Sequence, residues 1–271
     1  EINTNIVIDT STITNTSDST EVGNVYGGGD LGEVRGDTTI SIIAPNVKNS
    51  VYGGGNRADV VGNTSVALSD ESTSDFVYGG GNAGKVSGTG RVGSNGVTSS
   101  TAVSIDESSV TNTVYGGGNE GEVTGNAYVY CLDSTVTNAI FGGGKAANVG
   151  STIVSVLNTT LPDTYSTKYV YGGGDQGELT GSTTVTITKG TVENDIYGGG
   201  NGAATQSGTA VPGKVAGNTS VRLSNASTSN VFGGGNGATA RVDGNTVTIL
   251  ENSSTETREG DDISGHVFGI S

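Results

Sequence analysis

The fold of this chain is decided by residues 25–42, which read VYGGGDLGEVRGDTTISI. The run of an aliphatic residue, an aromatic residue and three glycines returns along the chain, with its aromatic at Tyr26, Tyr52, Tyr78, Tyr115, Phe141, Tyr171, Tyr197 and Phe232, and in a degenerate copy at Phe268. Successive aromatics are separated by 26, 26, 37, 26, 30, 26, 35 and 36 residues. A fixed period with longer intervals that carry insertions is typical of a repeat array.

Each repeat contains three strand-like pieces. One ends at the aromatic, one surrounds a single aliphatic residue such as Val34, and one carries two apolar residues in alternation with polar ones. The alternating pairs are Ile40/Ile42, Val66/Leu68, Val103/Ile105, Val129/Cys131, Val185/Ile187 and Val221/Leu223. A period of two indicates strands with one buried face. Cys131 therefore takes the place of a core aliphatic residue.

We therefore predict an all-β chain folded as a single-stranded parallel β-helix (β-solenoid), with about 26 residues and three short strands per coil and roughly 8–9 coils. Residues 1–271 form one domain, and residues 1–24 form a partial N-terminal coil. We expect the first members of the alternating pairs to stack in one buried column. Loops are inserted near residues 89–99, 161–167, 203–212 and 253–262.

Composition narrows the class of protein. The chain has 48 Gly but only 3 Pro, without the every-third-residue spacing of collagen, so turns must use the glycine. The net charge of −15 opposes a nucleic-acid partner, and no apolar run is long enough for direct membrane insertion. One Cys excludes an internal disulfide framework. We expect an extracellular or cell-surface location, and a monomer that begins at Glu1 as a fragment of a larger chain.

The glycine runs and the residue after them have structural explanations. A phosphate loop needs a following helix with Lys and Ser or Thr, and none follows any copy, so we expect glycines of tight turns or close packing. The next residue is Asp30, Asn56, Asn82, Asn119, Lys145, Asp175, Asn201 or Asn236. This row favours a hydrogen-bonded side-chain ladder over a row of metal ligands, and we predict neither a metal nor a cofactor.

The aromatic column is the candidate ligand site. Stacked rings either fill a corner of the coil or present a flat face to a sugar. Alternation along the strand predicts at least partial exposure, because each ring follows an inward-facing aliphatic residue. Phe in place of Tyr in three copies favours a structural role. The candidate ligand-binding residues are Tyr26, Tyr52, Tyr78, Tyr115, Tyr171 and Tyr197.

Catalytic groups are scarce. Asp261, Asp262 and His266 form the only paired acids with a His, and they resemble two elements of polygalacturonase-type hydrolases. In the hydrolases the paired Asp and the His come from separate coils, whereas Asp261, Asp262 and His266 lie within a few residues of one another. A solvated loop is therefore favoured over an active site here. There is no Gly-x-Ser-x-Gly sequence for a hydrolase nucleophile. We predict no catalytic residues.

The tandem Val-Tyr-Gly-Gly-Gly-Asn/Asp units resemble the repeat modules of adhesin-like surface proteins of bacteria and some archaea, whose passenger regions are parallel β-helices. The resemblance implies export and a structural or adhesive role. We predict a non-catalytic structural or adhesion module that binds a glycan or a host-surface partner through its aromatic column or its inserted loops. A polysaccharide-active β-helix enzyme, lyase or glycosidase-like, is the alternative. A second one is an ice-binding solenoid, which would use the recurring threonines Thr38, Thr39, Thr64, Thr183, Thr184, Thr219 and Thr246.

Overall fold

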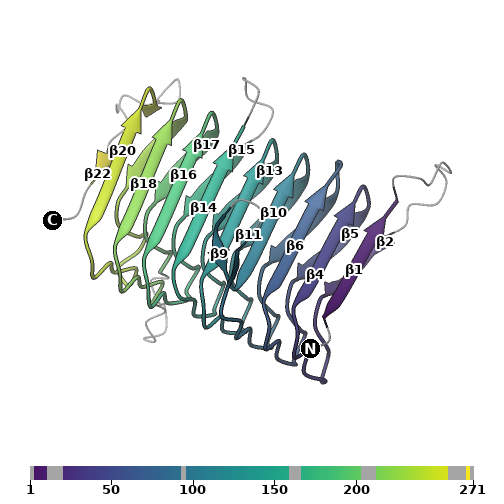
Figure 1. Cartoon of the computed structure of the whole chain (residues 1–271). Helices are drawn as coiled ribbons and strands as arrows, with labels where there is room; N and C mark the ends of the chain where they lie inside the picture. Colours follow the sequence, from purple (N-terminus) through teal and green to yellow (C-terminus); the bar gives the residue numbers. More distant parts are fainter. Residues whose placement is uncertain are drawn as a thin grey trace.

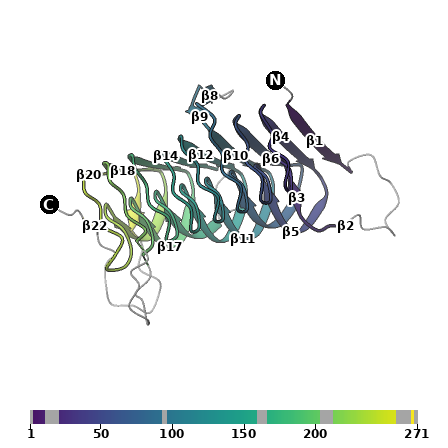
Figure 2. The same ribbon diagram turned by 90° about the horizontal axis from the view of Figure 1, so that it is seen from below.

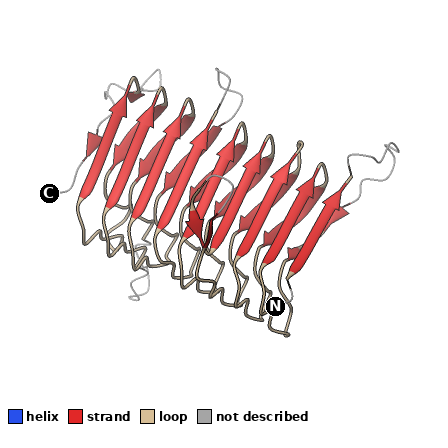
Figure 3. Cartoon of the chain, viewed as in Figure 1, coloured by secondary structure: helices blue, strands red, loops and turns tan. Residues whose placement is uncertain are grey.

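The computed structural model describes residues 3–10, 21–92, 96–158, 166–202, 212–255 and 267–268. Within these ranges the regular structure is entirely β, and successive strands lie side by side along a rod with the two chain ends at opposite extremities (Figures 1 and 3). Successive coils pair in parallel, so the predicted parallel β-solenoid is confirmed.

Sheet A contains the strands with alternating apolar residues. Every neighbouring pair in it is parallel, and like positions of successive repeats are in register, as in Ile40↔Val66. Its strands, in spatial order, are β1 (Thr4–Asp9), β4 (Thr38–Ile43), β6 (Thr64–Ser69), β10 (Thr101–Asp106), β12 (Ala127–Leu132), β14 (Thr152–Leu157), β16 (Thr183–Thr188), β18 (Thr219–Ser224) and β20 (Thr246–Glu251).

Sheet B contains the strands that end at the aromatic residue, and it forms the second layer of the same coils (Figure 2). Its main strands are β2 (Glu21–Val22), β5 (Asn46–Tyr52), β7 (Thr73–Tyr78), β11 (Ser109–Tyr115), β13 (Thr135–Phe141), β15 (Ser166–Tyr171), β17 (Thr191–Tyr197), β19 (Ser227–Phe232) and β21 (Ser254–Thr255). Two short strands also join it, β3 (Val25–Tyr26) on β5 and β22 (Val267–Phe268) on β19.

The third predicted strand of each coil is reduced to one bridged residue. Val34 pairs with Val60, Val60 with Val86 and Val86 with Val123, all in parallel, and the same ladder continues from Val149 to Val242. These side chains form a buried cluster of their own. In place of a third strand the coils therefore have isolated bridges, to which Asp175, Asn201 and Asn236 add a second row in the later coils.

The inward column of sheet A is confirmed as the core of the rod. Ile40, Val66, Val103, Val129, Val185 and Val221 are each at most 1% exposed. Cys131 lies in the same core cluster, and burial raises the pKa of its thiol to about 12. Such a thiol is inert as a nucleophile at neutral pH.

Threonine hydroxyls tie sheet A to the glycine runs. The side chain of Thr38 donates to the carbonyl of Gly53 at 2.5 Å, and that of Thr101 to Gly116 at 2.7 Å. The same bond joins Thr64 to Gly79, Thr152 to Gly172, Thr183 to Gly198 and Thr219 to Gly233. All six threonines are buried. Thr38, Thr64, Thr183 and Thr219 are therefore withdrawn from any ice-binding surface, and of the threonines considered for it only Thr39, Thr184 and Thr246 are at least partly exposed.

Sheet B strands bend before they reach the aromatic. The pairing register shifts between Val47 and Ser50 in β5 and between Val110 and Thr113 in β11, and β13 and β17 shift at the same place. A second row of Asn, which includes Asn49 and Asn112, lies in these shifts. A bulge of this kind leaves one residue outside the ladder and re-aims those that follow it.

The four predicted insertions have different outcomes. Residues 89–99 contain an antiparallel hairpin, β8 (Arg91–Val92) and β9 (Thr98–Ser99), which projects from the sheet A side of the rod (Figure 2). Of the loop near 161–167, only Ser166 and Thr167 are described, at the start of β15. Residues 203–211 and 256–262, which make up most of the other two insertions, lie outside the described residues, as do Asp261, Asp262 and His266.

Candidate binding groove

The predicted ligand residues form a stacked column of aromatic rings. From Tyr26 to Phe232, neighbouring rings have centroids 4.5–5.2 Å apart and planes within 8° of parallel. This repeat follows the spacing of adjacent strands, since each coil contributes one ring at the same position. The interior rings have a neighbour on both faces, so the faces that would stack on a sugar are already occupied.

The expected partial exposure of these rings is wrong for most of the column. Tyr52, Tyr78, Tyr115, Tyr171 and Tyr197 are 3–8% exposed, and only Tyr26 and Phe232 are half-buried. The rings do lie apart from the aliphatic core, in a separate cluster, as alternation predicts. Their cover includes neighbouring aromatics such as Phe76 and Tyr169 and, beside the phenols of Tyr115 and Tyr171, the residue after the glycines of a coil further along.

That residue forms the predicted side-chain ladder. The Asn56 amide donates to Asp30, Asn82 to Asn56 and Asn119 to Asn82, at 2.7–2.9 Å. Further along, Asn201 donates to Asp175 and Asn236 to Asn201. The hydroxyl of Tyr115 reaches the Asp175 carboxylate at 3.5 Å, and the Asn236 amide reaches the hydroxyl of Tyr171 at 3.4 Å. The column and the ladder together seal one corner of the rod.

The hairpin of residues 88–100 builds a different feature on sheet A. Gly90 and Gly96 have φ of +98° and +78°, the left-handed conformation that favours glycine. The Gly90 amide donates to the Asn63 side chain at 2.9 Å, and the Ser100 hydroxyl donates to the Gly88 carbonyl at 2.7 Å. Both ends of the hairpin are thus hydrogen-bonded to the rod or to each other.

Between this hairpin and sheet A lies a groove of about 800 Å³. Its floor includes the outward residues of β6 and β10, namely Ser65, Ala102 and Ser104, which are small and partly exposed. Two tyrosines of β12, Tyr128 and Tyr130, also line it. Their ring centroids lie 6.4 Å apart, with planes 15° from parallel. Tyr128 is buried, whereas Tyr130 is half-exposed.

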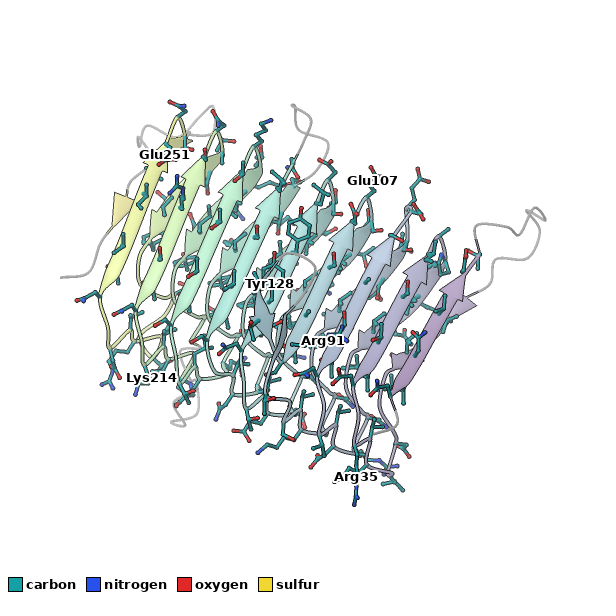
Figure 4. The ribbon with its side chains drawn as sticks, in the orientation of Figure 1. Arg35, Arg91, Glu107, Tyr128, Lys214 and Glu251 are labelled. Atoms are coloured by element: carbon teal, nitrogen blue, oxygen red, sulfur yellow. The ribbon has the colours of Figure 1, made fainter. Side chains whose placement is uncertain are left out.

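The groove carries one basic and one acidic side chain. Arg91 comes from the hairpin and lies on the same side of the rod as Tyr128 (Figure 4). Its guanidinium is 3.6 Å from the Asp37 carboxylate and remains largely exposed. Asp106 ends β10. Burial, together with the negative charges of Asp133 and Asp70, raises the pKa of Asp106.

Family models, curated proteins and solved structures were compared with this chain. None of them matches it. The account of the groove therefore depends on its own residues.

The groove residues do not suggest a complete hydrolytic pair. A glycosidase needs two carboxylates on opposite sides of the bond that it cleaves. The lining residues include a single carboxylate, that of Asp106. Within the described residues there is also no group of three or more side chains suited to a metal ion, and no helix long and apolar enough to cross a membrane.

Sequence reasoning identified the 89–99 insertion but missed the groove. One feature of the sequence could have revealed the groove. The outward positions of sheet A are Ser65/Ala67 in β6 and Ala102/Ser104 in β10, but Tyr128/Tyr130 in the coil that follows the insertion. Two large aromatics beside the small outward residues of β6 and β10, one coil from an insertion, indicate that the loop and the rings border one groove.

Proposed function

We propose that this chain is a non-catalytic structural and adhesion module of an extracellular or cell-surface protein. The observation that carries the proposal is that the repeated side chains bond to their own counterparts in the next coil. The aliphatic column, the Thr-to-Gly bonds, the aromatic column and the Asn ladder all run along the rod. The repeats are thus used to build a long stiff body, which leaves recognition to the insertions.

Charge supports an extracellular setting and limits the partners. The net charge of −15 keeps such a rod soluble and repels nucleic acid and anionic lipid surfaces. A carbohydrate or a protein of another cell surface is the expected partner. The resemblance to adhesin-like repeat modules supports the same proposal.

A polysaccharide-active enzyme is the second candidate. Asp106 and Arg91 line the same groove and would supply a proton-transfer group and a cation, although both belong to the single repeat between Tyr78 and Tyr115. The absence of a second carboxylate among the lining residues disfavours a glycosidase.

A panel of immobilised glycans and polysaccharides tests the proposal. We expect the purified chain to bind a subset of the panel, and the bound polysaccharide to keep its length during long incubation. New reducing ends or unsaturated products would instead establish the enzyme. A chain that binds neither a glycan nor any displayed surface protein would contradict the adhesive role.

A further inference from the structure

We infer that the groove between the hairpin and sheet A binds an extended, electrically neutral oligosaccharide, with one sugar ring against Tyr130. This inference rests on the proposed function and assigns its ligand class and its site. The site is distinct from the aromatic column, whose interior ring faces are covered.

The dimensions of the groove fit a short stretch of polymer. Its lining comes from three neighbouring strands, β6, β10 and β12, which at strand spacing span about 10 Å. Its volume of about 800 Å³ lies in the range of ligand sites. The hairpin bounds it on one side and the small-residue face of sheet A forms the other, so a chain-like ligand can lie between them.

The chemistry of the lining fits a polyol. Tyr130 is half-exposed and offers a flat apolar surface, and Tyr128 packs next to it at 6.4 Å between centroids. The hydroxyls of Ser65 and Ser104 both donate and accept hydrogen bonds, as sugar hydroxyls do. Arg91 adds donors and Asp106 adds acceptors at the same groove. A purely apolar ligand would leave these polar groups without partners.

Charge selects a neutral sugar over an acidic one. One guanidinium and one carboxylate line the groove, and the guanidinium already faces Asp37. A uronate would approach Asp106 and a chain with a net charge of −15. Repulsion from both disfavours acidic polysaccharides. The phenol of Tyr130 is protonated at neutral pH like any tyrosine, and burial and the charges of Asp106 and Asp133 raise its pKa further, so it adds a donor and no negative charge.

Calorimetry with three hexasaccharides tests the inference on the whole chain. The neutral probes are a β-1,4-glucan and an α-mannan, and the acidic probe is an α-1,4-galacturonan. We expect one neutral probe to bind and the galacturonan not to bind. Tyr130→Ala should weaken that binding about tenfold, the equivalent of about 1.4 kcal/mol of stacking.

Two further variants separate loss of the site from loss of the fold. Ala102→Trp fills the floor from an outward position and should abolish binding while the melting temperature is kept. Tyr169→Ala is the matched control, since Tyr169 is a partly buried tyrosine beside the aromatic column on sheet B, and its affinity should stay within about twofold.

The possible failures are distinguishable. If no neutral probe binds the folded chain, or if only the galacturonan binds, the ligand class is overturned while the rod-like module stands. If a neutral probe binds equally well to Ala102→Trp, the groove is not its site, although adhesion stands. If the probe is shortened, the non-catalytic function fails, while the groove remains a carbohydrate site.

Discussion

At the scale of single residues, the glycine runs are explained by the closeness of successive coils. A Cβ atom on Gly79 would run into the backbone carbonyl of Gly116, and one on Gly54 would lie 2.7 Å from the amide nitrogen of Gly81. These obstacles are backbone atoms of the next coil, which cannot rotate away. The three-glycine sequence is thus a packing requirement, and most of its copies need no unusual φ.

Gly79→Ala should lower the free energy of unfolding by at least about 3 kcal/mol, because the added methyl group forces neighbouring coils apart. Gly32→Ala is the control, since a Cβ there meets nothing within 4 Å. That change should be neutral or stabilising by up to about 1 kcal/mol through the unfolded chain. Chemical denaturation of both variants checks this. Equal losses would show that the coils are not packed as described.

Val129→Asp should lower the free energy of unfolding by at least about 3 kcal/mol, because it places an unpaired charge in the core column. Glu122→Ala should cost less than about 1 kcal/mol. Glu122 is exposed, and its ion pair with Lys85, at 3.0 Å, is a surface pair. Thermal unfolding of both variants distinguishes inside from outside. Similar melting temperatures would contradict the assignment.

At the scale of elements, the first residue of each sheet A strand links two parts of the coil. A threonine there donates to a glycine carbonyl in six buried instances, but β12 begins with Ala127. Ala127 is in register with Thr101 on one side and Thr152 on the other. The row of threonine hydroxyls is therefore interrupted at Ala127, between two positions where the hydroxyl is present.

Thr101→Ala should cost about 1–3 kcal/mol, because the Gly116 carbonyl loses its hydroxyl donor in a buried position. The reverse change, Ala127→Thr, should gain about 1 kcal/mol, since it supplies the missing donor in a slot that neighbouring coils fill with Thr. Urea unfolding of the two variants measures both effects. If Ala127→Thr destabilised the chain as much as Thr101→Ala, the row would owe its stability to shape and not to hydrogen bonding.

At the scale of the whole molecule, the rod has an aliphatic core of two clusters inside the coils and, as a second column, the buried aromatic rings. Burial of the second column has a consequence for alkaline stability. Burial first, and then nearby acids or tyrosines, raises the pKa of Tyr171 to about 12 and raises the pKa of Tyr78, Tyr115 and Tyr197 as well.

In the unfolded chain a tyrosine has a pKa near 10, and in the folded chain the pKa of these phenols is higher. Each such phenol contributes its full stabilisation of the folded state below about pH 10. That contribution is lost as the pH rises through the pKa of the folded state. We therefore expect stability to fall steeply above about pH 10. Phenolate absorbance and circular dichroism, followed together, check this. Most of the phenolate signal should appear together with loss of strand signal. Complete ionisation of the tyrosines in a chain that keeps its strands would mean that the column is open to water.

The repeats alone predict the period, the strand register, the core column and the Asn ladder. The reason is that in a parallel solenoid each repeat stacks on its own copy, so that equivalent positions in sequence become neighbours in space. Ile40 could be placed on Val66 without coordinates. The sealing of the rings beyond Val51 and its counterparts could be seen only in the folded chain, because their cover comes from neighbouring aromatics and from polar side chains, two of them two coils away. The folded chain was likewise needed to show that Arg91 of the hairpin lines one groove with Tyr128 and Tyr130, since the period gives no guide to where a loop that breaks the repeat will lie.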